Sequence, residues 1–378
     1  MPSTSSPAPA PSASLADLIA QRIRREGPLA FRDYMEMALY HPELGYYSNC
    51  DPSLDYQSSP NVHPVFGWCI ARQLTEIWRA LDRPARFDVL ECGAGSGRFA
   101  ADVVSGLQRA APDCADALRY RLQDRSYEAQ ARRQSVLESV GPAFVVEAGL
   151  PEAGGLNGCV LSNELIDAFP VHRVRLQSGR LLELCAGLEG ERFVDVECEA
   201  SSELHHYFDH LGLMPAEGCE ADVNLEAAPW LRKAAACLDR GYVLTLDYGY
   251  EAAEMYSPAR PQGTLLTFYR HTAGSDPYAR PGRQDITASV DFTSLMRAGV
   301  DVGLSTLGFV TQAEYLAALG IREALEARPS RNEMEAHHAL RRAALELTDP
   351  DGLGRIKVLL QGKGAPAAAP FASEGGYA

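Results

Sequence analysis

Residues 87–98 read Phe-Asp-Val-Leu-Glu-Cys-Gly-Ala-Gly-Ser-Gly-Arg, and this stretch decides the fold class. A short apolar run ends at Glu91 and leads into a turn with glycine at every second position, 93, 95 and 97. Glycine lets the backbone of such a turn approach a ligand closely, because no Cβ stands in the way. The stretch therefore predicts a buried strand, a ligand-binding turn and a helix that begins near Arg98.

Strands and helices alternate along the chain that follows. We expect helices at 127–140, 229–239, 292–298 and 312–319, and further strands at 120–124, 143–147, 158–163, 241–247, 304–310 and 355–360. Such alternation favours a parallel sheet with right-handed crossovers. The predicted fold class is α/β: a Rossmann-like, seven-stranded and mostly parallel sheet with an N-terminal helical extension and an inserted antiparallel and loop region for the substrate.

Breaks in the alternation suggest the organisation of the chain. Residues 171–198 alternate like hairpin strands around Ser178-Gly179 and Glu189-Gly190, and residues 250–290 are rich in Pro, Gly, Tyr and Arg. The predicted parts are a disordered tail (1–14), a helical extension (15–85), a core (86–170 and 229–362), an inserted antiparallel and helical segment (171–228), an active-site loop (250–290) and a second tail (363–378).

Composition narrows the class of partner. The net charge is −15, and no dense run of Lys or Arg occurs, which argues against a nucleic-acid partner. An acidic balance suits a cationic or neutral substrate, although solubility alone explains it equally well. The nine cysteines include no Cys-x-x-Cys pair, so we predict free thiols and no metal site.

The same residues bear on location. The longest apolar stretches are strand-length, so no membrane partner is predicted. The N-terminus has neither a secretory signal nor an Arg-rich presequence, which predicts a cytoplasmic protein. The oligomeric state stays open, with a homodimer as one candidate.

The glycine turn indicates which cofactor it binds. Arg98 stands where a dinucleotide-binding loop has its third glycine, and no Gly-Lys-Ser/Thr follows to make a Walker loop. S-adenosylmethionine has no phosphates but carries a cationic amino-acid end, which suits Glu91, and a ribose diol, which suits Asp124. A purely structural turn is the alternative. The predicted cofactor-binding residues are Glu91, Gly93, Ala94, Gly95, Gly97, Asp124, Arg125 and Asn163.

The segment Leu161-Ser-Asn-Glu-Leu-Ile-Asp-Ala-Phe-Pro-Val-His-Arg173 makes the interpretation more specific. It resembles the MidA family of class I methyltransferases, as do residues 27–35, 38–47, 58–60, 66–67, 123–126, 247–249, 263–264, 270–271, 281–282, 285–288, 290–292 and 357–359. Ser96, Gly97-Arg98 and Ser289 depart from the usual family residues. The resemblance spans about residues 20–362. It implies an S-adenosylmethionine-dependent methyltransferase that methylates an arginine side chain of a protein, because the mitochondrial members are protein-arginine methyltransferases that act in complex I assembly.

A guanidinium acceptor is fully protonated near neutral pH, so it needs carboxylates that orient it and receive its proton. Candidates follow the fourth and fifth core strands, where ligands bind in such sheets. The predicted catalytic residues are Asn163, Glu164, Asp167 and Asp247, and the predicted substrate-binding residues are Tyr46, Tyr47, Tyr248, His271 and Asp285. A protein or a small molecule is the expected methyl acceptor. The alternatives are a small-molecule O- or N-methyltransferase, a non-catalytic assembly factor that binds S-adenosylmethionine and, more distantly, an NAD-dependent oxidoreductase.

Overall fold

The computed structural model describes residues 14–125, 144–147, 149–151, 153–326 and 331–369. The helix predicted at 127–140, most of the N-terminal tail and the end of the C-terminal tail lie outside these residues. The predicted domain boundaries stay a prediction.

A seven-stranded sheet forms the centre of the molecule, in the order β16-β17-β10-β5-β2-β3-β4. Its strands are β2 (Phe87–Cys92), β3 (Leu118–Gln123), β4 (Phe144–Glu147), β5 (Leu156–Asn163), β10 (Leu238–Asp247), β16 (Ser305–Thr311) and β17 (Lys357–Lys363). Strand β17 is antiparallel to both of its neighbours, whereas β10, β5, β2, β3 and β4 pair in parallel. The predicted Rossmann-like fold is confirmed.

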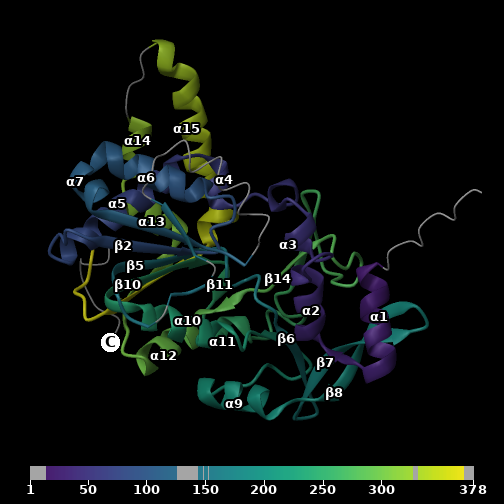
Figure 1. Cartoon of the computed structure of the whole chain (residues 1–378). Coiled ribbons are helices and arrows are strands. Elements are labelled where there is room, and N and C mark those ends of the chain that lie inside the picture. Colours follow the sequence, from purple (N-terminus) through teal and green to yellow (C-terminus); the bar gives the residue numbers. More distant parts are fainter. Residues whose placement is uncertain (1–13, 126–143, 148, 152, 327–330, 370–378) are drawn as a thin grey trace, which may run out of the picture.

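Helices cover both faces of this sheet (Figure 1). One face carries α5 (Val65–Ala80), α6 (Arg98–Ala110) and α13 (Gln312–Ala318), and the other carries α10 (Ala227–Cys237) and α12 (Phe292–Asp301). Phe66, Ile70, Leu74 and Ile77 recur at helical spacing in α5 and are fully buried against the strands. The apolar sides of the helices thus cover both faces of the sheet, and its strands are buried on both sides.

A second, antiparallel sheet lies beside the core (Figure 1). It consists of β1 (Leu29–Ala30), β6 (His172–Gln177), β7 (Arg180–Glu189), β8 (Arg192–Glu199) and β9 (Glu220–Val223), and β7 is its central strand. The turns between β6, β7 and β8 fall where the sequence predicts them, around residues 178–179 and 190. Helices α1 (Leu15–Glu26) and α2 (Phe31–Tyr40) pack against β7, so the N-terminal extension and the inserted segment share one apolar core.

Residues 249–291 contain short elements rather than one open loop. They are β11 (Gly249–Tyr250), α11 (Ala252–Met255), β12 (Leu266–Tyr269), β13 (Thr272–Gly274), β14 (Asp285–Thr287) and β15 (Val290–Asp291). Strands β13, β12 and β14 form a three-stranded antiparallel sheet. Strands of three or four residues are too short for their alternation to be recognised, which explains why the sequence predicts only a loop.

The remaining elements are short, except for one helix. They are α3 (Tyr46–Asn49), α4 (Ser59–Val62), α7 (Pro112–Ala117), α9 (Ser202–Leu211), α14 (Glu323–Glu326), α15 (Met334–Leu347) and the 3-10 turns η1 (Pro52–Leu54), η2 (Arg331–Glu333) and η3 (Leu353–Arg355). Helix α15, which the sequence analysis does not predict, extends away from the core (Figure 1).

The strand order fixes where a ligand can bind. From β2 the chain continues to β3 and β4 on one side, whereas β5 and β10 lie on the other side. Ligands of open α/β sheets bind outside the carboxyl ends of the strands at such a reversal. The glycine turn after β2 and Asn163-Glu164 after β5 both lie at this edge, because β2 and β5 are parallel neighbours.

Candidate functional site

The glycine turn has the backbone that its sequence suggests. Gly93, Gly95 and Gly97 have φ of 73°, 49° and 78°, a region that favours glycine. A Cβ on Gly93 would lie 2.8 Å from the Leu165 side chain, whereas a Cβ on Gly95 would meet nothing within 4 Å. The turn is therefore packed against the polypeptide after β5 at Gly93 and faces open space at Gly95, where a ligand has room.

Both predicted cofactor carboxylates lie at this turn. The backbone N–H of Gly95 donates to Asp124 Oδ2 at 2.7 Å, so Asp124 holds the turn from the end of β3. Glu91 is buried at the end of β2, and the Tyr120 hydroxyl donates to its Oε2 at 2.7 Å. The two carboxylates thus flank the turn, one near the end of β2 and the other directly after β3.

Asn163 supplies a test of whether the predicted cofactor fits here. Its Nδ2 donates to Glu164 Oε1 at 3.1 Å, while its buried Oδ1 has no hydrogen-bond partner in the structure. Buried acceptors in proteins nearly always have a donor. The ammonium group of S-adenosylmethionine carries such donors, so this oxygen is suited to the predicted cofactor.

Arg125 points elsewhere. Its guanidinium donates to Glu36 Oε1 at 2.7 Å and lies 4.4 Å from the centre of the Tyr40 ring. Both partners belong to α2, so the structure engages this side chain with the N-terminal extension. Its predicted contact with the cofactor has no support in this geometry.

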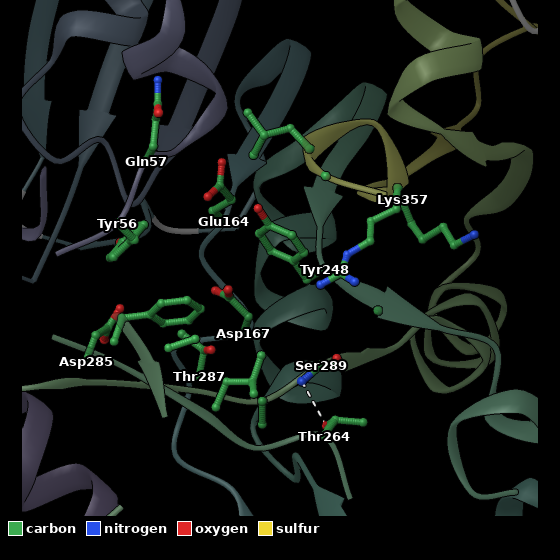
Figure 2. Close-up of a pocket in the computed structure, with 18 of the residues that line it drawn as sticks. Tyr56, Gln57, Glu164, Asp167, Tyr248, Thr264, Asp285, Thr287, Ser289 and Lys357 are labelled. Carbon is green, nitrogen blue, oxygen red and sulfur yellow. Dashed lines mark hydrogen bonds between the residues drawn. The ribbon is translucent and has the colours of Figure 1, made fainter. Parts of the chain in front are cut away.

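A cavity of about 590 Å³ opens at the same edge of the sheet, beyond β5 and β10 (Figure 2). Cavities of this size hold small-molecule ligands or parts of peptides. Three carboxylates that the sequence analysis singles out, Glu164, Asp167 and Asp285, line it. Its wall also includes Asp55, Tyr56, Gln57, Tyr248, Thr264, Leu266, Phe268, His271, Thr287, Ser289, Arg355 and Lys357.

Glu164 joins the turn after β5 to the N-terminal segment. Its backbone has φ of 48°, which is strained for a residue with a side chain. Its N–H donates to the Leu246 carbonyl at 2.8 Å, and its Oε1 accepts from the Ser59 N–H at 3.0 Å. Burial raises the pKa of this carboxyl to about 7.

Asp247 lies at the end of its strand, as predicted, but its side chain is engaged with the backbone. It is fully buried, and its Oδ2 accepts the N–H groups of Leu165, Ile166 and Asp167 at 3.2, 2.8 and 3.4 Å. Its Oδ1 accepts the Tyr248 N–H at 2.8 Å, and the side chain is absent from the cavity wall. This geometry suits Asp247 to position the turn that carries Asp167, and its predicted catalytic role stays a prediction.

The two remaining carboxylates repel each other within the cavity wall. Burial raises the pKa of Asp167 well above its usual range, and the charges of Asp247, Glu164 and Asp285 raise it further. Asp285 accepts from the Tyr47 hydroxyl at 3.1 Å through Oδ1, while its buried Oδ2 has no partner in the structure. Burial raises the pKa of Asp285 to about 7. A bound cation would relieve this repulsion.

Aromatic rings complete the wall, though not all of the predicted ones. Tyr248 lines the cavity as predicted, and Tyr56 and Phe268, which the sequence does not identify as site residues, line it too. Tyr46 lies behind the wall, where its hydroxyl donates to Asp55 Oδ2 at 2.8 Å. Tyr47 likewise acts from behind, through Asp285. Tyr56 sits in an aromatic loop of the sequence, but nothing local shows which of its rings faces the cavity.

His271 lies at the exposed rim of the cavity. It and Arg270 form the turn between β12 and β13, with φ of 59° and 50°. Asp55 holds this turn, since its carbonyl accepts the His271 N–H at 3.0 Å and its Oδ1 accepts the Arg270 N–H at 2.6 Å. The rim is thus tied to the N-terminal segment through the backbone and the side chain of one residue, Asp55.

Among the described residues, no group of three or more His, Cys, Asp or Glu side chains is arranged to hold a metal ion. In the same part of the chain, every helix is too short or too polar to cross a bilayer.

Known proteins share this architecture. A family model for S-adenosyl-L-methionine-dependent methyltransferases matches residues 69–310. A protein of Burkholderia thailandensis, solved in complex with S-adenosyl-homocysteine, superimposes with a TM-score of 0.85 at 30% sequence identity, covering 96% of this chain and 95% of that one. A second structure from the same organism, without that ligand in its description, gives 0.84 at 31% identity over 96% and 94%.

Curated relatives are more distant in sequence. The mitochondrial protein arginine methyltransferase NDUFAF7 homolog of Drosophila melanogaster is 26% identical, covering 97% of this chain and 89% of its own length. The mouse protein arginine methyltransferase NDUFAF7, also mitochondrial, is 25% identical over 79% and 72%. These mitochondrial relatives contradict the prediction of a cytoplasmic protein. That prediction is wrong because it is drawn only from the lack of an Arg-rich presequence.

Proposed function

Because this chain belongs to the MidA family of S-adenosyl-L-methionine-dependent methyltransferases, we propose that it methylates an arginine side chain of a protein. Its cofactor is S-adenosyl-L-methionine, which supplies an electrophilic methyl group to a nucleophile on the acceptor. The open question is the acceptor.

One observation carries the proposal: Glu164, Asp167 and Asp285 line a single cavity (Figure 2). Asp167 and Asp285 are buried and Glu164 is half-buried, and desolvation raises the pKa of each. Buried carboxylates without a cation are costly. A guanidinium would offset this cost with bidentate hydrogen bonds to planar carboxylates.

The same carboxylates suit the proton balance of the reaction. A guanidinium nitrogen gains a carbon bond and must lose a proton, because the methylated product is again a singly charged guanidinium. Asp167 and Asp285 carry raised pKa values, so either is a competent proton acceptor near neutral pH once the cation is bound. Tyr248 and Tyr56 would pack on the flat guanidinium face or on the apolar stem.

The curated relatives support this choice of acceptor, since those of Drosophila and mouse are named protein arginine methyltransferases. Their identity of about a quarter is modest. The carboxylates are therefore the stronger support.

The experiment is to incubate the full chain with methyl-labelled S-adenosyl-L-methionine and cell extract, and to separate protein from small molecules. Acid hydrolysis of labelled protein should release methylated arginine. Label in a small molecule would replace the proposal with a small-molecule methyltransferase. Cofactor binding without label in either fraction would favour a non-catalytic assembly factor.

A further inference from the structure

The cavity that holds the three carboxylates also has two cationic side chains in its wall. Arg355, at the end of η3, and Lys357, at the start of β17, line the same space as Asp167 and Asp285. Figure 2 shows Lys357 and Asp285 on opposite sides of Glu164, Asp167 and Tyr248. The cavity is therefore acidic at one end and carries positive charge at the other.

Carboxylates also lie near this positive end. Within the part of the chain that the structure describes, neither Arg355 nor Lys357 forms an ion pair. Asp351 and Glu254 line this end too, but Glu254 already pairs with Arg260 at 2.9 Å. Lys357 also lies close enough to Glu314 for its charge to lower the pKa of that carboxyl, so of the two cations Arg355 is the one that remains available to a ligand.

Of the two, Arg355 is better placed. Its guanidinium carbon lies 5.9 Å from the centre of the Tyr248 ring, and that ring itself lines the cavity. Such a distance is at the outer limit of cation–π attraction, so the ring orients the side chain without consuming its hydrogen-bond donors. The Lys357 ammonium instead points away from Glu164 and Asp167 (Figure 2).

From this arrangement we infer that the enzyme prefers an arginine with an acidic residue close beside it in the acceptor sequence, and that Arg355 selects that residue. The inference rests on the proposed function. At about 590 Å³, the cavity is larger than one arginine side chain requires, so neighbouring residues of the acceptor can enter it. The Cα of a residue next to the arginine lies about 3.8 Å from the arginine Cα. An acidic residue at that position would bring its carboxylate to the rim, near Arg355, while the arginine guanidinium lies among the carboxylates of the cavity.

The solvent exposure of Arg355 sets the size of the expected preference for acidic neighbours. Arg355 is exposed at the rim, so its pairing with a peptide carboxylate should contribute the small binding free energy that is typical of surface ion pairs. That corresponds to about two- to fivefold in kcat/KM, and salt should reduce it.

The test uses three peptides that each contain one arginine. The residues on both sides of that arginine are glutamate in the first peptide, glutamine in the second and lysine in the third. A fourth peptide has lysine in place of the arginine. The wild-type enzyme should methylate them in the order glutamate, glutamine, lysine, with the preference shrinking at high salt. Arg355→Glu should reverse the order. Arg192→Glu, the same charge change on the exposed end of β8, should keep the wild-type order.

Thermal unfolding of both variants checks that the fold is intact. Equal kcat/KM for the three arginine peptides, or an unchanged order in Arg355→Glu, would overturn the inference while leaving arginine methylation standing. Methylation of no peptide by the wild-type enzyme would remove the proposed function and the inference together.

Discussion

The glycine turn and the acceptor cavity lie at the same edge of the sheet but are built in different ways. The turn uses residues 91–97 and one carboxylate at the end of the neighbouring strand, Asp124. The cavity takes its carboxylates from the segment after β5 and from β14, and it rests on Asp247 after β10. A local site can be recognised from sequence, whereas an assembled one depends on the fold.

The comparison also separates two electrostatic tasks. At the turn, Asp124 and Glu91 each accept a hydrogen bond from the protein itself. In the cavity, Glu164, Asp167 and Asp285 gather with raised pKa values and gain most from an added cation. Variants should therefore divide into those that lose the cofactor and those that lose the acceptor.

The largest effect is expected for Asp167→Asn. It removes a carboxylate that faces the acceptor but leaves the glycine turn untouched, so kcat/KM on an arginine peptide should fall by about 10²- to 10⁴-fold. Cofactor affinity, measured by calorimetric titration, should stay within about twofold of wild type. The exposed Asp301→Asn serves as the matched control and should behave as wild type. Loss of cofactor affinity in Asp167→Asn would break the division between the two regions.

Asp247→Ala should act on stability. The substitution strips the acceptor from four backbone N–H groups, three of them in the turn that carries Asp167. We expect the free energy of unfolding to fall by about 2–4 kcal/mol in urea titrations. Asp247→Asn, which keeps one acceptor oxygen, should lose less, and the exposed Asp113→Ala should lose almost nothing. An equally stable Asp247→Ala protein would contradict its positioning role.

Glu91→Ala and Asp124→Ala should weaken cofactor binding. Each removes a charged hydrogen-bond acceptor worth roughly 1.5–3 kcal/mol, which corresponds to about ten- to a hundredfold in Kd. Asp124→Asn is a sharper variant, because its amide oxygen can still accept from the Gly95 N–H and only the charge is lost. Unchanged calorimetric affinity in both alanine variants would remove these residues from the cofactor site.

The last effect to measure is the pH dependence of acceptor affinity. Burial raises the pKa of Glu164 and of Asp285 to about 7, and Asp167, Asp247 and Asp55 face them. An arginine acceptor needs ionised carboxylates, so its affinity should rise by at most about tenfold per pH unit for each group and level off above about pH 7. Glu164→Gln should flatten the profile. An acceptor affinity that does not change between pH 5.5 and 7.5 would contradict the binding of the guanidinium by Glu164, Asp167 and Asp285.

Stability without an acceptor should follow the opposite trend. These carboxyls bind protons more tightly in the folded than in the unfolded state, so they favour folding most at pH values below their ordinary pKa. That contribution is lost as pH rises through about 7. Urea titrations of wild type against Glu164→Gln, at pH 5.5 and 7.5, measure it.

Sequence reasoning reaches as far as periodicity and local turns allow. It predicts β2, α6 and the hairpins of the second sheet, because long alternations and glycine turns identify them. It misses α15 and the small sheet of β12, β13 and β14. In the cavity it finds Glu164 and Asp167, which share one motif, but assigns Asp247 to chemistry. Only the register of β10 beside β5 brings Asp247 beneath that motif.

The most direct test of the account compares two peptides that differ only in arginine or lysine at one position, with mass spectrometry after incubation with S-adenosyl-L-methionine. The account predicts methylation of the arginine peptide alone, and its loss in Asp167→Asn while the variant still binds cofactor. Methylation of both peptides, or full activity in Asp167→Asn, would contradict a carboxylate-lined site for a guanidinium acceptor.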